Sequence, residues 1–153
     1  SSAYDVDPLG EDREKLNKKL RSLVFGGETI EATAYKKTDV LRTDVLDAVE
    51  SVFDEWDVLV TPTAAVPAFD YDSEGPTEIE GQPIEPACGW VLTQPFNMSG
   101  HPAASIPAGR TSEGLPVGLQ VIGPRFDEEA VLTASAAFER QRPWHASYEE
   151  IVL

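Results

Sequence analysis

A serine–histidine pair is the feature of this sequence that comes nearest to nucleophilic chemistry. Serine hydrolysis needs a hydroxyl beside a base, with amide donors aimed at the developing oxyanion. Ser99 is followed two residues later by His101, and no G-x-S-x-G elbow is present. Two residues on a turn rarely let an imidazole reach the hydroxyl, so the spacing favours a plain loop over a catalytic pair.

The lone Cys88 precedes a glycine and has no cationic neighbour that would favour its thiolate. A small, partly buried residue is therefore favoured over a nucleophile. One cysteine and two histidines cannot build a disulfide framework or a closed zinc site, and His145 beside Trp144 is interpreted as a surface residue. The widely spaced glycines of the second half lack the lysine of a phosphate-binding loop. The residues alone give no complete active site, no cofactor and no metal site.

Two helices are predicted in the first third of the chain, where they would support any site that follows. Residues 11–25 can form a charged helix with one apolar side, which the pair Gly26–Gly27 is expected to end. A second helix is predicted from about Thr29, because apolar residues then recur at spacings of three and four. These residues are Leu41, Val45, Val49, Val52 and Trp56.

Strands and a long loop are predicted next. Residues 57–63, D-V-L-V-T-P-T, are typical of a strand buried on both faces. Residues 64–87 are acidic and rich in proline and glycine, which predicts a long loop. Residues 103–107 and 117–122 predict two strands, and the glycines between them indicate an antiparallel pair.

A last helix completes the predicted pattern. Asp127 is a suitable N-cap, followed by two glutamates where the helix dipole favours anions, and Pro143 is expected to end the helix. Val131, Ala134, Ser135 and Phe138 would line one side of it. Because helices and buried strands alternate, the fold class expected is α/β.

The charge balance excludes two kinds of partner. The 153 residues carry 12 Lys plus Arg against 27 Asp plus Glu, a formal net charge of −15. Such a chain repels both the phosphate backbone of nucleic acid and an anionic membrane surface. No stretch approaches ~18 consecutive apolar residues, and no signal peptide is recognisable in the first residues. The predicted location is the cytoplasm.

The acidic side chains are concentrated in one part of the sequence. Neither lysine nor arginine occurs between Arg42 and Arg110, whereas carboxylates recur throughout that segment. Molar salt screens such repulsion, so the charge is interpreted as adaptation to a salt-rich, halophilic cytosol. The alternative is a docking face for a basic partner, in which case the chain would be a non-catalytic acidic binding module.

Three sequence blocks, taken together, resemble a known family. They are D-V-L-V-T-P-T at 57–63, P-F-N-M-S-G-H-P-A-A-S-I-P-A-G at 95–109 and G-L-P-V-G-L-Q-V-I-G at 114–123. In this order, and followed by F-D-E-E-A-V-L, they are similar to the C-terminal part of the amidase signature family, over about residues 23–144. The resemblance implies that the chain completes an α/β/α fold with a mixed sheet and flanking helices.

The resemblance also implies that the catalytic residues lie elsewhere. Family members cleave amides with a serine nucleophile, a second serine and a lysine base, all in a Gly/Ser-rich segment of the N-terminal half. The sequence contains no such segment, and none of its five lysines matches a family catalytic position. Residues 1–153 are thus expected to be a partial amidase signature domain, inactive alone, with residues 1–10 as a polar lead-in. The implied partners are a small-molecule amide substrate and the N-terminal half of the same protein; a homodimer is left open.

Three candidate substrate-binding residues follow from the resemblance or from their position. Arg42 corresponds to an arginine that holds the substrate carboxylate in the A subunits of glutamine-dependent tRNA amidotransferases. The alternative is a helix arginine paired with one of the many carboxylates. Thr61 and Thr63 flank the proline that ends the predicted strand, a common place for pocket residues in α/β sheets.

Trp90 is the fourth candidate, and it bears on the substrate. It stands where the amidotransferase branch has an acidic residue that grips the glutamine amino group. An indole cannot form that ion pair, which favours an amidase acting on linear, less polar or aromatic amides. The alternatives are the A subunit of an aminoacyl-tRNA amidotransferase, which needs a second protein as its partner, and a Trp90 that only fills the core.

Overall fold

The computed structural model describes residues 15–16 and 18–145, which form parts of two compact units, Ser1–Leu41 and Arg42–Leu153. The predicted lead-in at 1–10 and the first residues of the predicted helix lie outside the described residues. No described helix combines the length and apolarity that crossing a membrane would require.

Helix α1, Lys18–Glu28, lies in the first unit and ends later than predicted. Gly26 and Gly27 belong to its last turn, so the expectation that this pair ends the helix is wrong. A glycine ends a helix by adopting positive φ, and neither of these glycines does so. Thr29 follows the helix, and its hydroxyl donates to the carbonyl of Gly26 at 2.9 Å.

Helix α2, Ala32–Phe53, begins in the first unit and continues into the second. The middle of the predicted apolar stripe is confirmed, because Val49 is buried with Val45 packed against its cluster. The two ends are wrong: Leu41 is exposed, and the helix stops before Trp56, which is 62% exposed.

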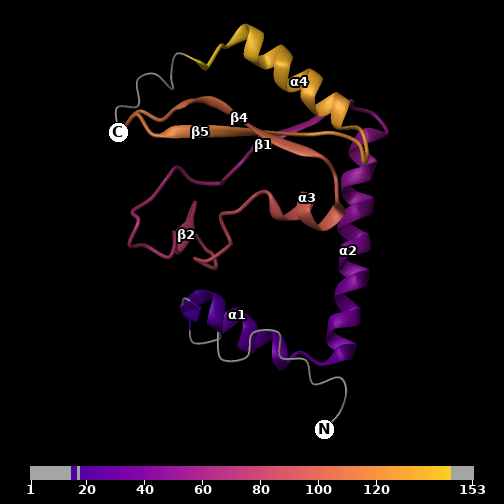
Figure 1. Cartoon of the computed structure of the whole chain (residues 1–153), viewed down its shortest axis with the longest axis vertical. Helices are drawn as coiled ribbons and strands as arrows, with labels where there is room; N and C mark the ends of the chain where they lie inside the picture. Colours follow the sequence, from indigo (N-terminus) through magenta and orange to yellow (C-terminus); the bar gives the residue numbers. More distant parts are fainter. Residues whose placement is uncertain (1–14, 17, 146–153) are drawn as a thin grey trace. The chain divides into compact units, whose positions relative to one another are not determined.

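The second unit contains a three-stranded sheet in the order β1–β5–β4, with every pairing antiparallel (Figure 1). The strands are β1, Leu59–Pro62; β4, Ala103–Arg110; and β5, Pro116–Ile122. The predicted antiparallel pair is therefore confirmed as β4 and β5. The chain reverses between them at Gly114, whose φ of 86° is open to glycine at no steric cost.

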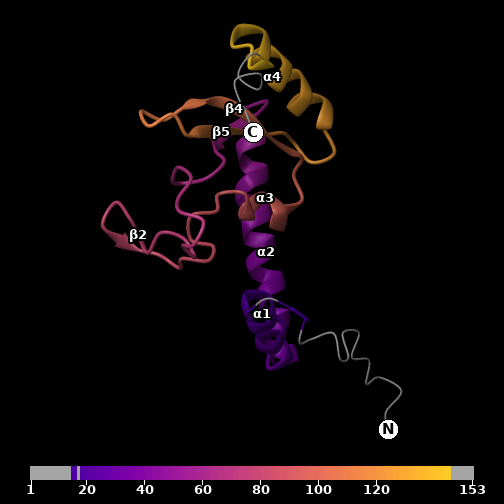
Figure 2. The ribbon, with the colours of Figure 1, turned by 60° about the vertical axis from the view of Figure 1, so that its left-hand side comes forward.

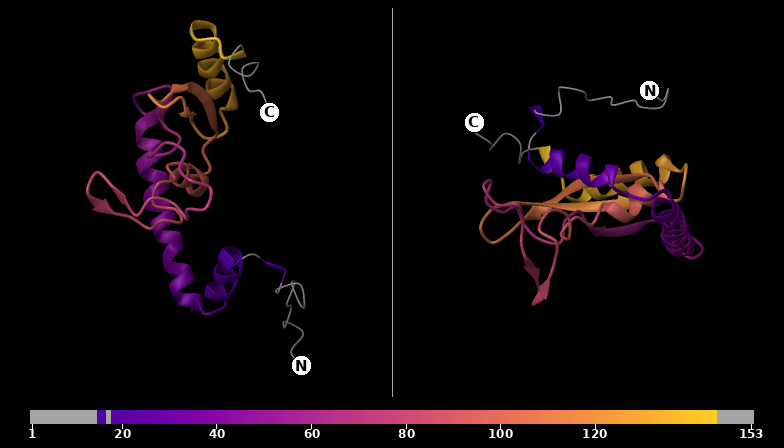
Figure 3. Two further views of the ribbon diagram at one scale, coloured as in Figure 1. Left: turned by 90° about the vertical axis from the view of Figure 1, so that its left-hand side faces the viewer. Right: turned by 90° about the horizontal axis from the view of Figure 1, so that it is seen from below.

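One face of this sheet is covered by α4, Glu128–Gln141 (Figures 1 and 3). Asp127 caps the helix as predicted, since its carboxylate accepts a hydrogen bond from the backbone N–H of Ala130 at 3.0 Å. Val131 of α4 packs on Ile106 and Val121 of the sheet, and Phe138 adds to this cluster. Burial of these apolar groups holds α4 to the strands.

The opposite face is covered over part of its length by the end of α2 and by α3, Gln94–Ser99. Val49 of α2, Phe96 of α3 and Ile122 of β5 form the buried cluster there. Figure 3 shows α3 and α4 on opposite sides of the sheet. The remainder of this face is available for a site.

Strand β1 differs from its prediction. Its residues alternate between partly buried and exposed, and Val60 is 48% exposed. Within the described residues β1 pairs only with β5, so it is an edge strand with one face partly open rather than a strand buried on both faces.

The proline- and glycine-rich segment after β1 contains a small hairpin, seen apart from the sheet in Figure 2. Strands β2, Glu78–Ile79, and β3, Gln82–Pro83, are joined by Glu80 and Gly81. Both joining residues have positive φ, 50° and 77°, as a type I′ turn requires.

Helices packed on both faces of a sheet give an α/β fold, as predicted. The described strands pair only antiparallel, so the mixed sheet stays a prediction for the whole protein.

Candidate substrate groove

An open groove of about 840 Å³ lies where β1 ends and β4 and β5 turn. It is lined by residues 62–69, Trp90, residues 105–107 and residues 116–118. Of the predicted site residues, Thr63 and Trp90 line this groove. Thr61 lies nearby on β1, and Arg42 lies on α2 outside the lining.

Trp90 forms one wall of the groove together with Phe69. The two rings meet edge to face, with centroids 5.1 Å apart. The indole N–H donates to the carbonyl of Pro86 at 2.9 Å, so the ring presents an apolar surface to the groove. Gly75 fits tightly here, because a Cβ on it would lie 2.1 Å from the Pro86 carbonyl oxygen.

Two hydroxyls form the polar part of the floor. Thr63 Oγ1 and Ser105 Oγ are 2.7 Å apart and hydrogen-bonded, although the residues are 42 positions apart in sequence. Gly118 of β5 lies directly beside them: a Cβ there would be 2.8 Å from the threonine oxygen and 2.9 Å from the serine oxygen. The absence of a side chain at Gly118 therefore makes room for the pair.

A row of polar side chains crosses the sheet beside this floor. Gln120 of β5 stands between Thr61 of β1 and Ser105 of β4 in the strand register. Its side chain is almost fully buried, and its amide nitrogen donates to Thr61 Oγ1 at 3.1 Å and to the carbonyl of Leu92 at 3.4 Å. We call Thr61, Gln120 and Ser105 the polar row. Its hydrogen bonds tie β1 to β5 and to the segment leading into α3.

Arg42 has a different environment. Its guanidinium Nη2 donates to the backbone carbonyl of Met98 at 3.1 Å, which links α2 to α3. The side chain is exposed. A role in binding a substrate carboxylate stays a prediction.

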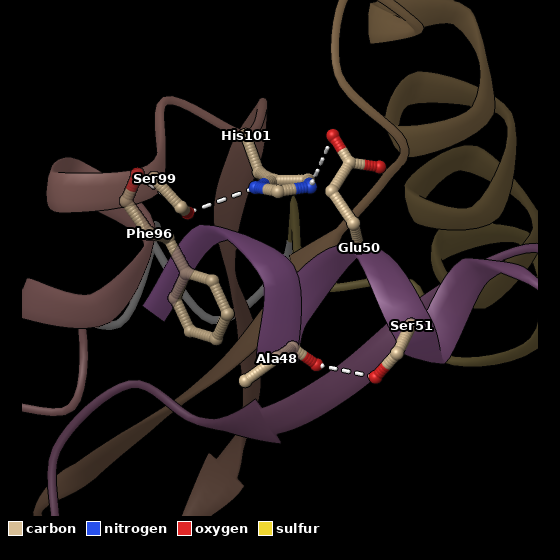
Figure 4. A network of polar contacts seen from close by, with 6 residues as sticks. All are labelled: Ala48, Glu50, Ser51, Phe96, Ser99 and His101. Carbon is tan, nitrogen blue, oxygen red and sulfur yellow. Dashed lines mark hydrogen bonds and ion pairs between the residues drawn. The ribbon is translucent and has the colours of Figure 1, made fainter. Parts of the chain in front are cut away.

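The Ser99–His101 contact corrects the sequence analysis. His101 Nδ1 lies 2.8 Å from Ser99 Oγ, so the imidazole does reach the hydroxyl, because α3 ends at Ser99 and Gly100 turns the chain with a φ of 73°. Figure 4 shows the imidazole between Ser99 and Glu50 of α2. His101 Nε2 is 3.5 Å from the Glu50 carboxylate, beyond good hydrogen-bonding geometry.

This arrangement has the residue types of a serine hydrolase triad but lies in the core. Ser99 and His101 are 5% and 6% exposed, and the imidazole stacks on Phe53 with centroids 5.3 Å apart. Neither residue lines the groove. Burial lowers the pKa of His101, an effect that nearby Arg125 reinforces and Glu50 partly offsets. The network therefore joins α2 and α3 as a structural element.

Cys88 is exposed, so the expectation of a partly buried residue is wrong. It lies in the turn that leads to Trp90, where the N–H of Val91 donates to its carbonyl. Within 15–16 and 18–145, no three His, Cys, Asp or Glu side chains come together in a way that could hold a metal ion.

The chain is similar to known amidases over most of its length. The sequence model of the amidase family matches residues 11–132. The A subunit of the glutamyl-tRNA(Gln) amidotransferase of Streptococcus pneumoniae is 42% identical over 111 residues, which is 72% of this chain and 22% of that protein. An acylamidase of Rhodococcus erythropolis is 32% identical over 145 residues, 94% of this chain and 30% of that protein.

Comparison with solved structures gives relatives of the same kinds. A bacterial aryl acylamidase of the amidase signature family superposes with a TM-score of 0.79 and 40% identity, covering 95% of this chain and 30% of that one. The A subunit of the glutamyl-tRNA(Gln) amidotransferase from Thermotoga maritima gives a TM-score of 0.61 and 30% identity, covering 87% and 29%. The chain belongs to the amidase family, whose enzymes are hydrolases acting on carbon–nitrogen bonds. It spans less than a third of the length of these relatives.

Sequence reasoning missed three residues of the groove region, namely Phe69, Ser105 and Gln120. Gln120 could have been found from the sequence, since a lone amide interrupts the apolar run L-Q-V-I of a predicted strand. Ser105 could have been found in the same way, between Ala104 and Ile106. Phe69 could not, because its place beside Trp90 depends on the path of an irregular segment.

Proposed function

We propose that this chain is part of an amidase that hydrolyses linear carboxylic amides of low polarity, through an acyl-serine intermediate. The groove walled by Trp90 and Phe69 carries this proposal, because it suits an apolar or aromatic group of a small amide. In this proposal the serine hydroxyl adds to the amide carbon, the amine leaves with a proton, and water releases the acid. The nucleophile, the second serine and the lysine base belong to polypeptide outside these 153 residues, so the chain alone is inactive.

The residues of the chain have binding roles in this proposal. Trp90 and Phe69 exclude water from one side of the substrate, and Thr63 stands at the floor. Thr61 supports the groove indirectly, because its hydroxyl accepts a hydrogen bond from the Gln120 side chain. Arg42 lies outside the groove lining and bonds the Met98 carbonyl, which positions α3; its role in holding a substrate carboxylate is proposed only for the amidotransferase candidate below.

A second candidate is the A subunit of a glutamine-dependent amidotransferase. The 42% identity to the Streptococcus pneumoniae protein supports it. Two observations favour the amidase: an indole at position 90 cannot pair with the glutamine amino group, and the aryl acylamidase structure superposes better than the Thermotoga maritima protein, with TM-scores of 0.79 against 0.61.

The test compares substrates in the full-length protein that carries this chain. We expect kcat/KM for benzamide or an anilide to exceed that for glutamine by at least about tenfold, since an apolar wall discriminates by roughly this factor. Trp90→Asp should reverse part of the preference, whereas Trp144→Phe, away from the groove, should leave it unchanged. A higher kcat/KM for glutamine than for benzamide or the anilide would contradict the amidase proposal and support the amidotransferase candidate.

The acidic surface supports a proposal about environment: a cytoplasm rich in salt. Carboxylates dominate between Arg42 and Arg110, and their mutual repulsion weakens as the Debye length falls to about 3 Å at 1 M salt. We expect the unfolding temperature to rise by several degrees between 0.1 M and 2 M KCl, measured by circular dichroism. An unfolding temperature independent of KCl would contradict salt adaptation and leave the docking face for a basic partner as the explanation.

A further inference from the structure

We infer that the Thr63–Ser105 hydroxyl pair selects among substrates of the groove, favouring apolar or aromatic amides that carry a second oxygen able to accept a hydrogen bond. The inference rests on the proposed function and adds a substrate subclass to it. Its evidence is the hydrogen-bond inventory of the pair, the way three strands hold it, and the apolar surroundings.

The pair has one hydrogen left to donate. Each hydroxyl carries one hydrogen, and the 2.7 Å bond between Thr63 Oγ1 and Ser105 Oγ uses one of the two. Among the described residues, neither hydroxyl makes a second side-chain hydrogen bond. An oxygen on a bound molecule would satisfy the remaining hydrogen, whereas a methyl group in the same place would leave it unsatisfied.

The pair is held on rigid elements. Ser105 lies within β4, and the backbone N–H of Thr63 donates to the Gly118 carbonyl of β5 at 3.1 Å. Gly118 also leaves the two oxygens the space that a Cβ would occupy. Gln120, two residues on, faces Ser105 across the strands and ties β5 to Thr61. A donor fixed in this way discriminates better than one on a mobile loop.

The surroundings make the pair the polar centre of the groove. Thr63, Ser105 and Trp90 are the lining residues whose side chains carry a polar atom, and the Trp90 N–H is occupied by Pro86. Prolines, alanines and valines provide most of the rest. A single donor on an apolar surface orients a ligand, because its loss is not compensated by neighbouring polar groups.

The test uses the full-length protein and two carboxamides of similar shape, 4-acetylbenzamide and 4-isopropylbenzamide. Only the first has the additional acceptor. We expect ammonia release with about tenfold higher kcat/KM for the acetyl compound, mostly through KM. The double variant Thr63→Val, Ser105→Ala should bring the ratio to within about twofold. Thr63→Ser should retain the preference, and the exposed Thr133→Val on α4 serves as the matched control.

Each outcome decides the inference. An equal rate for both compounds in the wild-type protein, or a preference that survives the double variant, overturns it. If that double variant does not fold, the double variant Thr63→Ala, Ser105→Ala, which also removes both hydroxyls, decides in the same way. If neither compound is hydrolysed, the proposed function fails separately. Calorimetric titration then decides the inference: tighter binding of the acetyl compound that the variant abolishes supports it, and equal binding overturns it.

Discussion

The two faces of the three-stranded sheet are built from the same strands but have opposite character. The face under α4 is apolar, with Ile106 and Val121 packed on Val131. The other face carries the polar row Thr61–Gln120–Ser105 at its centre and the groove at one end. Because side chains alternate along a strand, Ser105 and Ile106 serve different faces although they are neighbours. One face supplies stability, and the other fixes polar groups at a site.

The apolar face should respond most strongly to mutation. Ile106→Ala removes a side chain that is 7% exposed and leaves a cavity under α4. We expect a loss of about 2–5 kcal/mol in the free energy of unfolding. Urea denaturation followed by tryptophan fluorescence measures it. Leu132→Ala, on the exposed side of α4 at 66%, should change stability by less than about 0.5 kcal/mol. Equal losses in the two variants would show that α4 does not stabilise this face.

The floor of the groove should be sensitive to added volume. Gly118→Ala places a methyl group 2.8 Å from Thr63 Oγ1 and 2.9 Å from Ser105 Oγ, so one hydroxyl must move. We expect the free energy of unfolding to fall by about 1–3 kcal/mol, and the preference for 4-acetylbenzamide over 4-isopropylbenzamide to weaken. Gly27→Ala is the matched control: it has open space around it within α1 and should stabilise the helix by up to about 1 kcal/mol. An unchanged stability in Gly118→Ala would indicate that the pair is loosely held.

The polar row should give an intermediate effect. Gln120→Leu keeps the volume of a nearly buried side chain but removes the donor to Thr61 and to the Leu92 carbonyl. We expect the free energy of unfolding to fall by about 1–2 kcal/mol, since the two acceptors lose their hydrogen-bond donor. Adding Thr61→Val to this variant should recover part of the loss. A double variant whose losses simply add would show that Gln120 and Thr61 are not coupled.

Local sequence signals predicted the parts of the fold that depend on neighbouring residues. The turn glycines gave the β4–β5 pair, and Asp127 gave the start of α4. Thr63 and Trp90 were predicted to lie at a pocket and both line the groove, although what they bind stays a prediction. The bond between Thr63 and Ser105 joins residues 42 positions apart and depends on strand register, which periodicity alone does not give.

The exposed edge of β1 also shows that a local sequence pattern does not determine long-range packing. The run V-L-V predicted burial on both faces, but burial depends on which elements cover the strand. Val60 is 48% exposed, and the described residues provide only β5 as a neighbour. Likewise, the short spacing of Ser99 and His101 argued against contact, whereas the left-handed Gly100 brings the side chains together.

The smallest predicted effect is the pH dependence of stability caused by His101, which lies between Ser99 and Glu50. Burial is the main cause that lowers the pKa of His101 below its ordinary value of 6.5, with Arg125 acting in the same direction and Glu50 against it. The unfolded chain therefore binds a proton more readily than the folded one. The stability contributed by the neutral imidazole is fully present above pH 6.5 and is lost as pH falls below it toward the folded pKa.

His101→Gln removes this titration while its amide can still bond Ser99. We expect the free energy of unfolding of the wild-type protein to fall more steeply between about pH 6.5 and 5 than that of the variant, by at most about 1.4 kcal/mol per pH unit for one proton. Comparing the two slopes cancels the titration of the many carboxylates. Parallel slopes would mean that the imidazole is protonated as easily in the core as in the unfolded chain, so that the Glu50 carboxylate fully offsets the effect of burial and of Arg125.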